Sequence, residues 1–540
     1  MSRSIFFSLI IASWASAQEG APDAGVPAVE APAGAVVAVV DAGAPAAVTV
    51  AVAVEAPAAA VVSVVDAGAP SADEPRGFSA SVHGSVRLAG TYVNAFPLDA
   101  DGTRLSPTPI ESRIRINPEV RYRSFGLIAE FDAVTGALYG TPNSTLVGAR
   151  VPFPALRPAE LRQLYAEYRW ASGGARLGLQ TNHFGLGMLA NAGAKDAEPG
   201  DFGHQQFGSL ALRALVLARP FMSWGGGWIA VEPVAAFDLV VRDSTVDLFD
   251  GDRALQGILG VRLNVDEKNN LGLFAIYRSS RPLNSITGER STDVLVIDAS
   301  AQWRFFDALD VGAEVAGITG TTTQTRSVEN QLLQVRQLGA LVKASYKVGR
   351  FGFMLDTGFA SGDSNPYDDQ LTNFRFDRDL KAGLILFDQV IGWQSARSAW
   401  RAADSNLVGV PPEGVALLPT GGAVTGAFYI FPRARVRIAS LVDVYGGPLF
   451  AFTTAPLTDP FNTRVLAGGV PVNFLNGLGN GLLGTELDLG ASIKHRFDFG
   501  LTVTAVVEGG VLLPGAALSD AAGKPMGPVG LGRLRLSAAY

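Results

Sequence analysis

The sequence predicts an all-β fold, a transmembrane antiparallel β-barrel of about 18 strands. The chain has 540 residues, of which 62 are glycine, 48% are hydrophobic and only 17% are charged. After the first 17 residues, no apolar stretch is long enough for a membrane helix, which needs about 18 residues free of charge and proline. From residue 78 onward apolar and polar residues alternate, as they do on a β-strand with one apolar face.

Residues 1–17 predict a secretory signal peptide. Arg3 gives a short positive start, an apolar core runs from Ile5 to Ile11, and Ala15-Ser16-Ala17 is a cleavage site of small residues. The alternative is a short buried helix. The chain has no cysteine, which excludes a disulfide scaffold, thiolate zinc sites, iron–sulfur clusters and a lipid-anchor cysteine.

Residues 18–77 form a low-complexity linker rich in Ala, Val and Pro. The segment from Glu30 to Pro45 recurs from Glu55 to Pro70, and aromatic residues are absent. Such a composition cannot bury a core, so we expect a disordered spacer, with a tether to the cell wall or a periplasmic partner as the alternative. The linker has eight acidic residues and one basic residue, so it carries most of the net charge of −7.

The barrel is predicted to cover residues 78–540, and its strands are long. In a typical run Leu483, Leu487 and Leu489 share one face, while Glu486 and Asp488 share the other. A soluble sandwich also alternates, but its strands average about six residues. These runs have roughly 11–16, enough for a tilted membrane strand. The predicted strands are 78–94, 111–123, 126–139, 160–171, 174–184, 207–218, 227–242, 254–265, 270–280, 292–306, 309–320, 331–347, 350–362, 427–438, 441–453, 483–497, 500–513 and 528–540. Sixteen strands is the competing count.

Short and long connections alternate along the chain. This is the pattern of an outer-membrane barrel, which has short periplasmic turns and long outer loops. An open sheet edge is unstable in lipid, so the sheet must close. An even number of strands places both the linker and the C-terminus in the periplasm. The long loops are predicted near 95–110, 140–159, 185–206, 281–291, 321–330, 363–423, 455–482 and 514–526.

The last strand ends in an aromatic residue, Tyr540, which shares a face with Leu536 and Leu534. This end resembles the C-terminal signal read by the barrel-assembly machinery of Gram-negative bacteria. The sequence therefore predicts the bacterial outer membrane as the location. Its partners there would be the assembly machinery, outer-membrane lipid and lipopolysaccharide.

The polar strand faces carry charges of both signs and are predicted to line a lumen. Such charges select solutes by sign, or else neutralise one another in Arg–carboxylate ladders that support the wall. Arginine is densest in runs 111–123 and 427–438, which predicts a positive constriction and a modest anion preference. The predicted pore-lining residues are Arg113, Arg115, Glu119, Arg121, Glu130, Asp132, Glu167, Asp298, Arg304, Glu314, Lys343, Asp356, Arg433, Arg435, Arg437, Glu486 and Asp488.

The long loop after the thirteenth run holds the most specific local sequence, from Gly358 to Asp369, which reads GFASGDSNPYDD. It resembles the G-Y-A-S-G-D-x-[DN]-P-x-D segment of alginate-export-type and related proteobacterial porins, with Phe359 in place of the usual Tyr. The resemblance implies a passive outer-membrane pore, but it does not carry alginate over as the substrate. Loop 363–423 is long enough to fold into the pore, with a helix near 390–402.

The same loop offers the only candidate metal ligands, in a spacing that departs from the EF-hand. They are Asp363, Asn365, Asp368 and Asp369, whose hard oxygens suit Ca²⁺. A solvated acidic loop is the alternative, and no other cofactor is predicted.

The four histidines, His83, His183, His204 and His495, are scattered, and no catalytic motif is recognised. We therefore predict no enzyme, and the lack of a basic aromatic patch argues against nucleic-acid binding. The predicted function is a porin-like channel for passive diffusion of small polar or anionic solutes, filtered by inward loops and lumen charges. The alternative is a structural or adhesive barrel whose lumen a loop blocks.

Overall fold

The computed structural model describes residues 77–140, 155–194, 198–203, 205–221, 231–266, 268–281, 290–325, 330–366, 368–463 and 469–540. The predicted signal peptide and nearly all of the predicted linker lie outside the described residues, as do His204 and Tyr367.

Long strands make up most of the described chain, and 18 of them form the barrel. The predicted count of 18 is therefore confirmed, and the competing count of 16 is wrong. The largest difference in bounds is at the seventh strand, predicted from 227, which begins at Val231 directly after residues that are not described. The strands are β1 Phe78–Val93, β4 Ile110–Tyr122, β5 Phe125–Tyr139, β6 Arg157–Trp170, β7 Gly173–Asn182, β8 Ser209–Ala218, β9 Val231–Arg242, β10 Arg253–Asn264, β11 Asn270–Arg281, β12 Thr292–Phe305, β13 Leu309–Thr322, β14 Leu333–Val348, β15 Phe351–Ala360, β17 Ala427–Ala439, β18 Val442–Thr453, β19 Leu482–Arg496, β20 Thr502–Pro514 and β21 Val529–Ala539.

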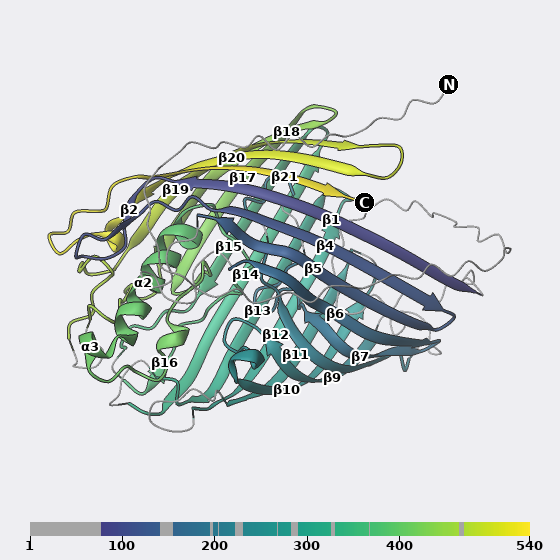
Figure 1. Ribbon diagram of the computed structural model, residues 1–540, viewed down its shortest axis with the longest axis horizontal. Coiled ribbons are helices and arrows are strands. Elements are labelled where there is room, and N and C mark those ends of the chain that lie inside the picture. Colours follow the sequence, from purple (N-terminus) through teal and green to yellow (C-terminus); the bar gives the residue numbers. More distant parts are fainter. Residues whose placement is uncertain are drawn as a thin grey trace, which may run out of the picture. The chain divides into compact units, whose positions relative to one another are not determined.

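Each barrel strand pairs antiparallel with its neighbours in chain order, and the first strand closes on the last (Figure 1). β1 pairs with β4 on one side and with β21 on the other, where Val86 lies opposite Ala538 and Leu88 opposite Leu536. Closure leaves no open sheet edge along the paired part of the seam, which is what a barrel surrounded by lipid requires.

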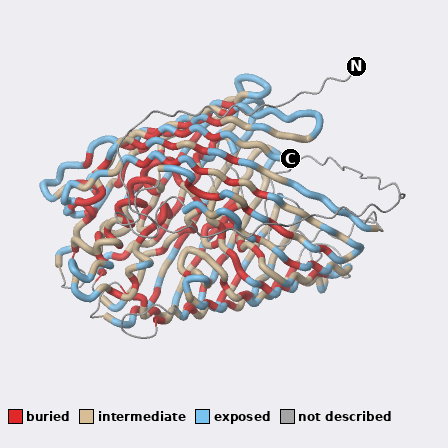
Figure 2. The backbone as a smooth tube through the Cα atoms, viewed as in Figure 1, coloured by how far each residue is buried: buried red, intermediate tan, exposed pale blue. Residues whose placement is uncertain are grey.

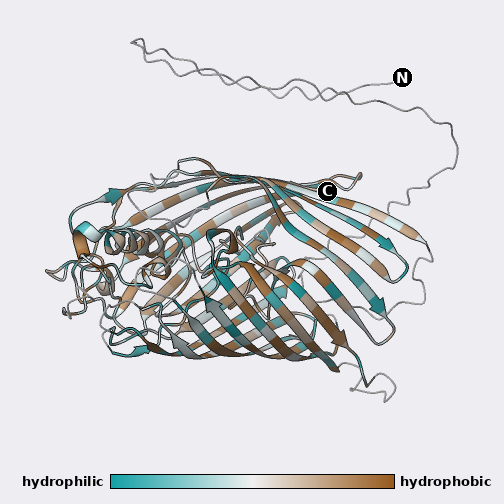
Figure 3. Cartoon of the chain, turned by 60° about the horizontal axis from the view of Figure 1, so that its bottom comes forward, coloured by the Kyte–Doolittle hydropathy of each residue, from teal (hydrophilic) through white to brown (hydrophobic). Residues whose placement is uncertain are grey.

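The two faces of the wall have opposite character, and the apolar one points outward. On β19, Leu487 and Leu489 are 50% and 59% exposed, whereas Glu486 and Asp488 are both fully buried. Figure 3 shows the resulting bands of hydrophobic and hydrophilic residues along the strands. Leu483 departs from the predicted outer face and is buried, because the pairing of β18 with β19 skips it between Gly484 and Leu482.

The connections differ in length at the two ends of the barrel. At one end, the turn end, short turns join the strands except between β8 and β9, where 219–230 connects them. At the other, the long-loop end, the connections are long loops. The loop after β1 holds a small hairpin, and the loop after β15 holds most of the helical residues and a short strand that pairs with β14. No helix of the described residues is long and apolar enough to cross a membrane. The elements within the loops are β2 Phe96–Pro97, β3 Arg104–Leu105, η3 Leu248–Asp250, β16 Gln370–Leu371, the π-helix η4 Leu386–Ile391, α2 Gly392–Ala403, α3 Ser405–Val408, η5 Val415–Leu417 and η6 Ala516–Leu518.

Two long loops, 183–208 and 361–426, fold inward and supply much of the buried core (Figures 1 and 2). Trp393 and Phe387 of the second loop pack with Tyr429 and Leu449 on the barrel wall, and the first loop adds Met188. The predicted inward fold of the long loop and its helix are confirmed, with α2 covering nearly the predicted residues. The described interior is therefore a packed core next to the wall rather than an empty tube.

The outward-facing apolar side chains give a direct test of the orientation of the wall. Leu489→Arg places a charge in the middle of the outer face, and in lipid this should cost roughly 2–4 kcal/mol of unfolding free energy. Phe499→Arg is the matched control, since Phe499 is 63% exposed but lies in the turn between β19 and β20. Near the interface the cost should be about 0–1 kcal/mol. Urea titration in lipid vesicles measures both, and equal costs would contradict the orientation.

Candidate functional site

The predicted pore-lining residues lie on the inward face of the wall, and most are buried. Asp298, Glu314, Glu486 and Asp488 are at most 1% exposed. Arg437 near the turn end is the most exposed of them, with 52% of its side chain exposed. Whether these residues line a conducting path stays a prediction.

Opposite charges on the wall are paired within the described barrel. Arg115 donates to both oxygens of Asp132 at 2.6 and 2.8 Å. Glu167 accepts from three arginines, Arg121, Arg169 and Arg176. Most of the other predicted residues pair in the same way: Glu119 with Arg121, Glu130 with Arg115 and Arg162, Arg304 with Asp310, Asp356 with Lys343 and Arg433, and both Arg435 and Arg437 with Asp443. The ladders offered by the sequence are therefore present, and the two arginine-dense strands are largely neutralised.

A row of arginines also holds the first inward loop by its carbonyl oxygens. These arginines lie on β17, β21, β1, β4 and β6. In the closed sheet these strands follow one another in this order, with β18–β20 between β17 and β21 and with β5 between β4 and β6. A guanidinium has five donors in a planar fork, so it can serve a carboxylate and a carbonyl at once. The donor–acceptor pairs are Arg162 to Ala192 and Phe207, Arg113 to Gly193 and Gln205, Arg87 to Gln205, Arg115 to Gly193, Arg433 to Gly200, and Arg533 to Phe202.

Two wall glutamates hold the inward loops by their backbone N–H groups. Glu486 accepts from Leu384, Ile385 and Leu386 at 2.5–2.8 Å. Glu314 on β13 accepts from the N–H groups of Leu186 and Met188 in the first loop. N–H groups of nearby residues that converge on one carboxylate form an anion-binding nest, and each of the two glutamates occupies one such nest.

A glycine precedes the N–H donors in each nest. Gly383 has φ +72° and Gly185 has φ +49°, a region that L side chains rarely adopt. A Cβ at either position would lie 2.7 Å from an oxygen of the facing glutamate, Glu486 or Glu314 respectively. The close approach of backbone to carboxylate therefore requires glycine, and the same local solution appears in both loops.

A third acidic pair, Asp377 and Asp379, joins the two loops to each other. Asp379 accepts from the N–H groups of Gln206, Phe207 and Gly208. Burial raises the pKa of Asp377 well above its usual value, and the neighbouring Asp379 carboxylate raises it further. Asp377 therefore takes up a proton more readily than an ordinary aspartate.

Helix α2 is fixed by contacts on its exposed side as well as by its buried face. Arg397 donates to Asp99 at 2.8 Å, and Arg401 donates to Asp101. Burial works to raise the pKa of Asp99, but the hydrogen bonds from Arg397 and Thr103 outweigh it and lower the pKa. The loop after β1 therefore clamps α2 by charge pairing.

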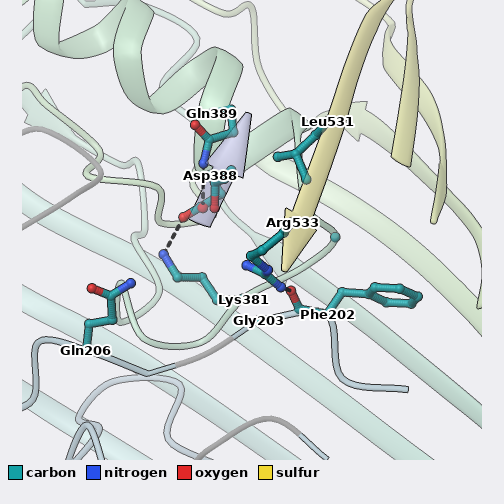
Figure 4. Close-up of a pocket in the computed structure, with 10 residues that line it drawn as sticks. Phe202, Gly203, Gln206, Lys381, Asp388, Gln389, Leu531 and Arg533 are labelled. Atoms are coloured by element: carbon teal, nitrogen blue, oxygen red, sulfur yellow. Dashed lines mark hydrogen bonds and ion pairs between the residues drawn. The ribbon is translucent and has the colours of Figure 1, made fainter. Parts of the chain in front are cut away.

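The inward loops leave a small and a large cavity. The small one is about 10 Å³, room for about one water, and lies between the loops and β1 and β21. There the Lys381 ammonium pairs with Asp388 at 2.5 Å, and Arg533 lies beside Phe202 (Figure 4). The large cavity is about 400 Å³ and lies toward the long-loop end, between the inward loops and the wall from β7 to β14. The loops therefore narrow the interior strongly at Lys381 and leave it open on the other side.

The candidate calcium ligands lie in a turn rather than around a common centre. Asp363 accepts from the N–H of Asn365, and Asp368 accepts from the N–H of Gln370. Within the described part of the chain, no three His, Asp or Glu side chains are placed to hold a metal ion. Calcium binding at Asp363, Asn365, Asp368 and Asp369 stays an untested prediction.

Several residues that hold the interior are not among the predicted pore-lining residues. Strand alternation places Arg87 and Arg162 on the inner face, but it does not show that they bind the first inward loop. Lys381 has no such signal in the sequence. Inward apolar residues such as Val296 are also outside the prediction, because alternation predicts a polar inner face along every strand. The signal for these was a break in alternation, as in Val294-Leu-Val-Ile297, where both faces of the strand are apolar.

Comparisons with known proteins give a fold likeness at low scores. No family model matches the chain, and no curated protein matches it. Among solved structures, OccAB1 of Acinetobacter baumannii is 10% identical, with a TM-score of 0.42 over 85% of this chain and 96% of that chain. A BenF-like porin from Pseudomonas fluorescens is 10% identical, with a TM-score of 0.43 over 85% and 98%. Pseudomonas aeruginosa OccK2, solved in complex with glucuronate, is 10% identical, with a TM-score of 0.40 over 85% and 95%. Similarity at this level says nothing about a solute, and the barrel is defined by its own strand pairing.

The Glu486 nest predicts how firmly the second loop is held. Glu486→Ala leaves three buried N–H groups without their acceptor, and each lost partner costs about 1–3 kcal/mol. Amide hydrogen exchange of residues 384–386 should then accelerate by at least about tenfold. Glu232→Ala is the matched control, because Glu232 is equally buried but pairs with Arg219 and Asn264 on the wall. Equal exchange in both variants would contradict the nest.

Asp459 predicts that docking of the loop after β18 depends on pH. It accepts from Ser398 of α2, and burial raises its pKa from 3.8 to about 6. Because the pKa is higher in the folded chain, docking is strongest below 3.8 and weakens as pH rises through about 6. A nitroxide on Val470→Cys, at an exposed position of the loop after β18 in a chain without other cysteines, should become more mobile between pH about 4 and about 7. Asp459→Asn should remove this change, and its persistence there would contradict the assignment.

Proposed function

We propose that the chain is an outer-membrane channel through which small polar or anionic solutes diffuse passively, without a catalytic step. The observation that carries the proposal is the inverted wall: a closed barrel whose outside is apolar and whose inside carries paired charges and a cavity of about 400 Å³. An apolar exterior with a polar interior is stable only where lipid surrounds the barrel.

The inward loops supply the means of selection. Loop 361–426 narrows the interior at Lys381, and loop 183–208 lies against the arginine row. Solutes would be sorted by size at this narrowing and by sign at the charges around it, where Lys381 and Arg533 face Asp388. The periplasmic placement of both termini, the signal peptide and the linker belong to the same proposal.

A second candidate is a structural or adhesive barrel with a blocked lumen. The small cavity of about 10 Å³ favours it, because the loops there leave room for about one water and are held by the wall through many hydrogen bonds.

Conductance of the full-length protein in planar lipid bilayers separates the two candidates. We expect stable current steps and a reversal potential with a modest anion preference. Clear cation selectivity would contradict the charge assignment, and silence of well-folded protein would favour the blocked barrel.

A charge reversal locates the filter. Lys381→Glu should shift the reversal potential toward cations, since it changes the sign at the narrowing. Lys268→Glu is the matched control, because Lys268 is exposed in the turn between β10 and β11. A similar shift in both variants would place selection outside the narrowing.

A further inference from the structure

One side of the inner wall carries a continuous apolar row instead of charges. Ile258 on β10 pairs with Ile276 on β11, Ile276 with Val296 on β12, and Val296 with Ile318 on β13. On the other flank Ala236 of β9 pairs with Ile258 and continues the row. These are directly opposed positions in neighbouring strands, so their side chains touch across the sheet. The row departs from the alternation that gives the rest of the wall a polar inside.

The middle of this row forms one wall of the large cavity. Ile276, Val296 and Ile318 line it from the barrel, while Leu189 and Phe376 face them from the two inward loops. At about 400 Å³, the cavity has the size of a small-molecule site. A hydrated ion would lose water at this apolar surface and gain no polar partner there, which is costly. A solute with an apolar side of its own can instead bury that side against the row.

The charged groups of the cavity are already engaged by the protein. Arg278 pairs with Asp243 at 2.5 Å, and Arg375 donates to the carbonyl oxygens of Leu417 and Pro419. Burial works to raise the pKa of Asp243, but the Arg278 charge outweighs it and lowers the pKa. The Arg278–Asp243 pair is therefore neutral overall, and the guanidinium of Arg375 is already engaged by loop carbonyl oxygens.

Uncharged amides supply the polar contacts. Gln337 pairs with Ile318 and ends the apolar row on β14. The side-chain oxygen of Asn373 is buried at the cavity and accepts no hydrogen bond from the described residues. Because a buried acceptor without a hydrogen bond is costly, this oxygen points to a ligand with an O–H or N–H donor.

We propose that the cavity binds uncharged amphipathic small molecules, which place an apolar side on the Ile276–Val296–Ile318 row and a hydroxyl or N–H donor on Asn373. The inference rests on the proposed channel function and names a solute class for it: neutral amphiphiles are held at this site on their way through. Ions and fully polar solutes gain nothing from the row.

The test measures occupancy without using conduction. Ser209 lines the cavity, and the chain has no cysteine, so Ser209→Cys gives one reporter thiol. The rate of its modification by a small thiol reagent is followed by mass spectrometry in the folded full-length protein. The probes are benzyl alcohol, benzoate as the charged analogue of the same ring, and glycerol as a polar neutral molecule. We expect benzyl alcohol to slow modification by about threefold or more at concentrations where the other two have little effect.

Substitutions in the row give the second arm. Val296→Thr is nearly isosteric and Ile318→Thr removes one methyl group, and together they make the row polar, so protection by benzyl alcohol should fall by about threefold. The matched control is Val234→Thr, a buried inner-wall valine outside the cavity, which should keep full protection. Heat-modified gel mobility confirms that each variant is folded.

Protection by benzoate equal to that by benzyl alcohol would overturn the assignment to neutral ligands. Protection that survives the row substitutions, or no protection by benzyl alcohol, would overturn the site. Bilayer conductance of the same preparation reports separately on the channel, so failure of the site and failure of the channel are distinguishable.

Discussion

The interior depends on one interaction, the hydrogen bonding of loop backbone by charged side chains of the wall. An inward loop brings backbone N–H and C=O groups into a buried space, where leaving them without hydrogen bonds is costly. Here the arginine row takes carbonyls from 183–208, and Glu314 and Glu486 take N–H groups from the two loops. The wall charges, whose own burial would be unfavourable, find partners in the same step.

This arrangement divides the interior into two sides with different roles. Where the wall is charged, it is occupied by docked loops and is narrow around Lys381. Where the wall carries the apolar row, from Ile258 on β10 to Ile318 on β13, the row's side chains give the loops no hydrogen-bond partners, and the large cavity lies against them. Whether the inward residues of the wall are charged or apolar thus decides whether the wall there holds a loop or borders the large cavity.

Much of the fold was predictable because each signal was local. Alternation and loop length gave the 18 strands, and composition placed a helix close to α2. The ion-pair ladders followed from the charges on inward faces. The partners of the loops did not follow, since contacts such as Arg433 with Gly200 or Glu486 with Leu384 join segments far apart in the chain. The apolar row also needed the strand register, because only pairing brings Ile258, Ile276, Val296 and Ile318 into line.

The seam between β1 and β21 has a consequence for how the barrel forms. Val93 and Leu531 are neighbours in the closed sheet but lie at opposite ends of the folded sequence. Contacts between residues so far apart in sequence form slowly, because the chain loses the entropy of loop closure before the contact stabilises it. Every shorter intermediate exposes two strand edges, so the barrel stays a target for wrong pairing until its last strand arrives.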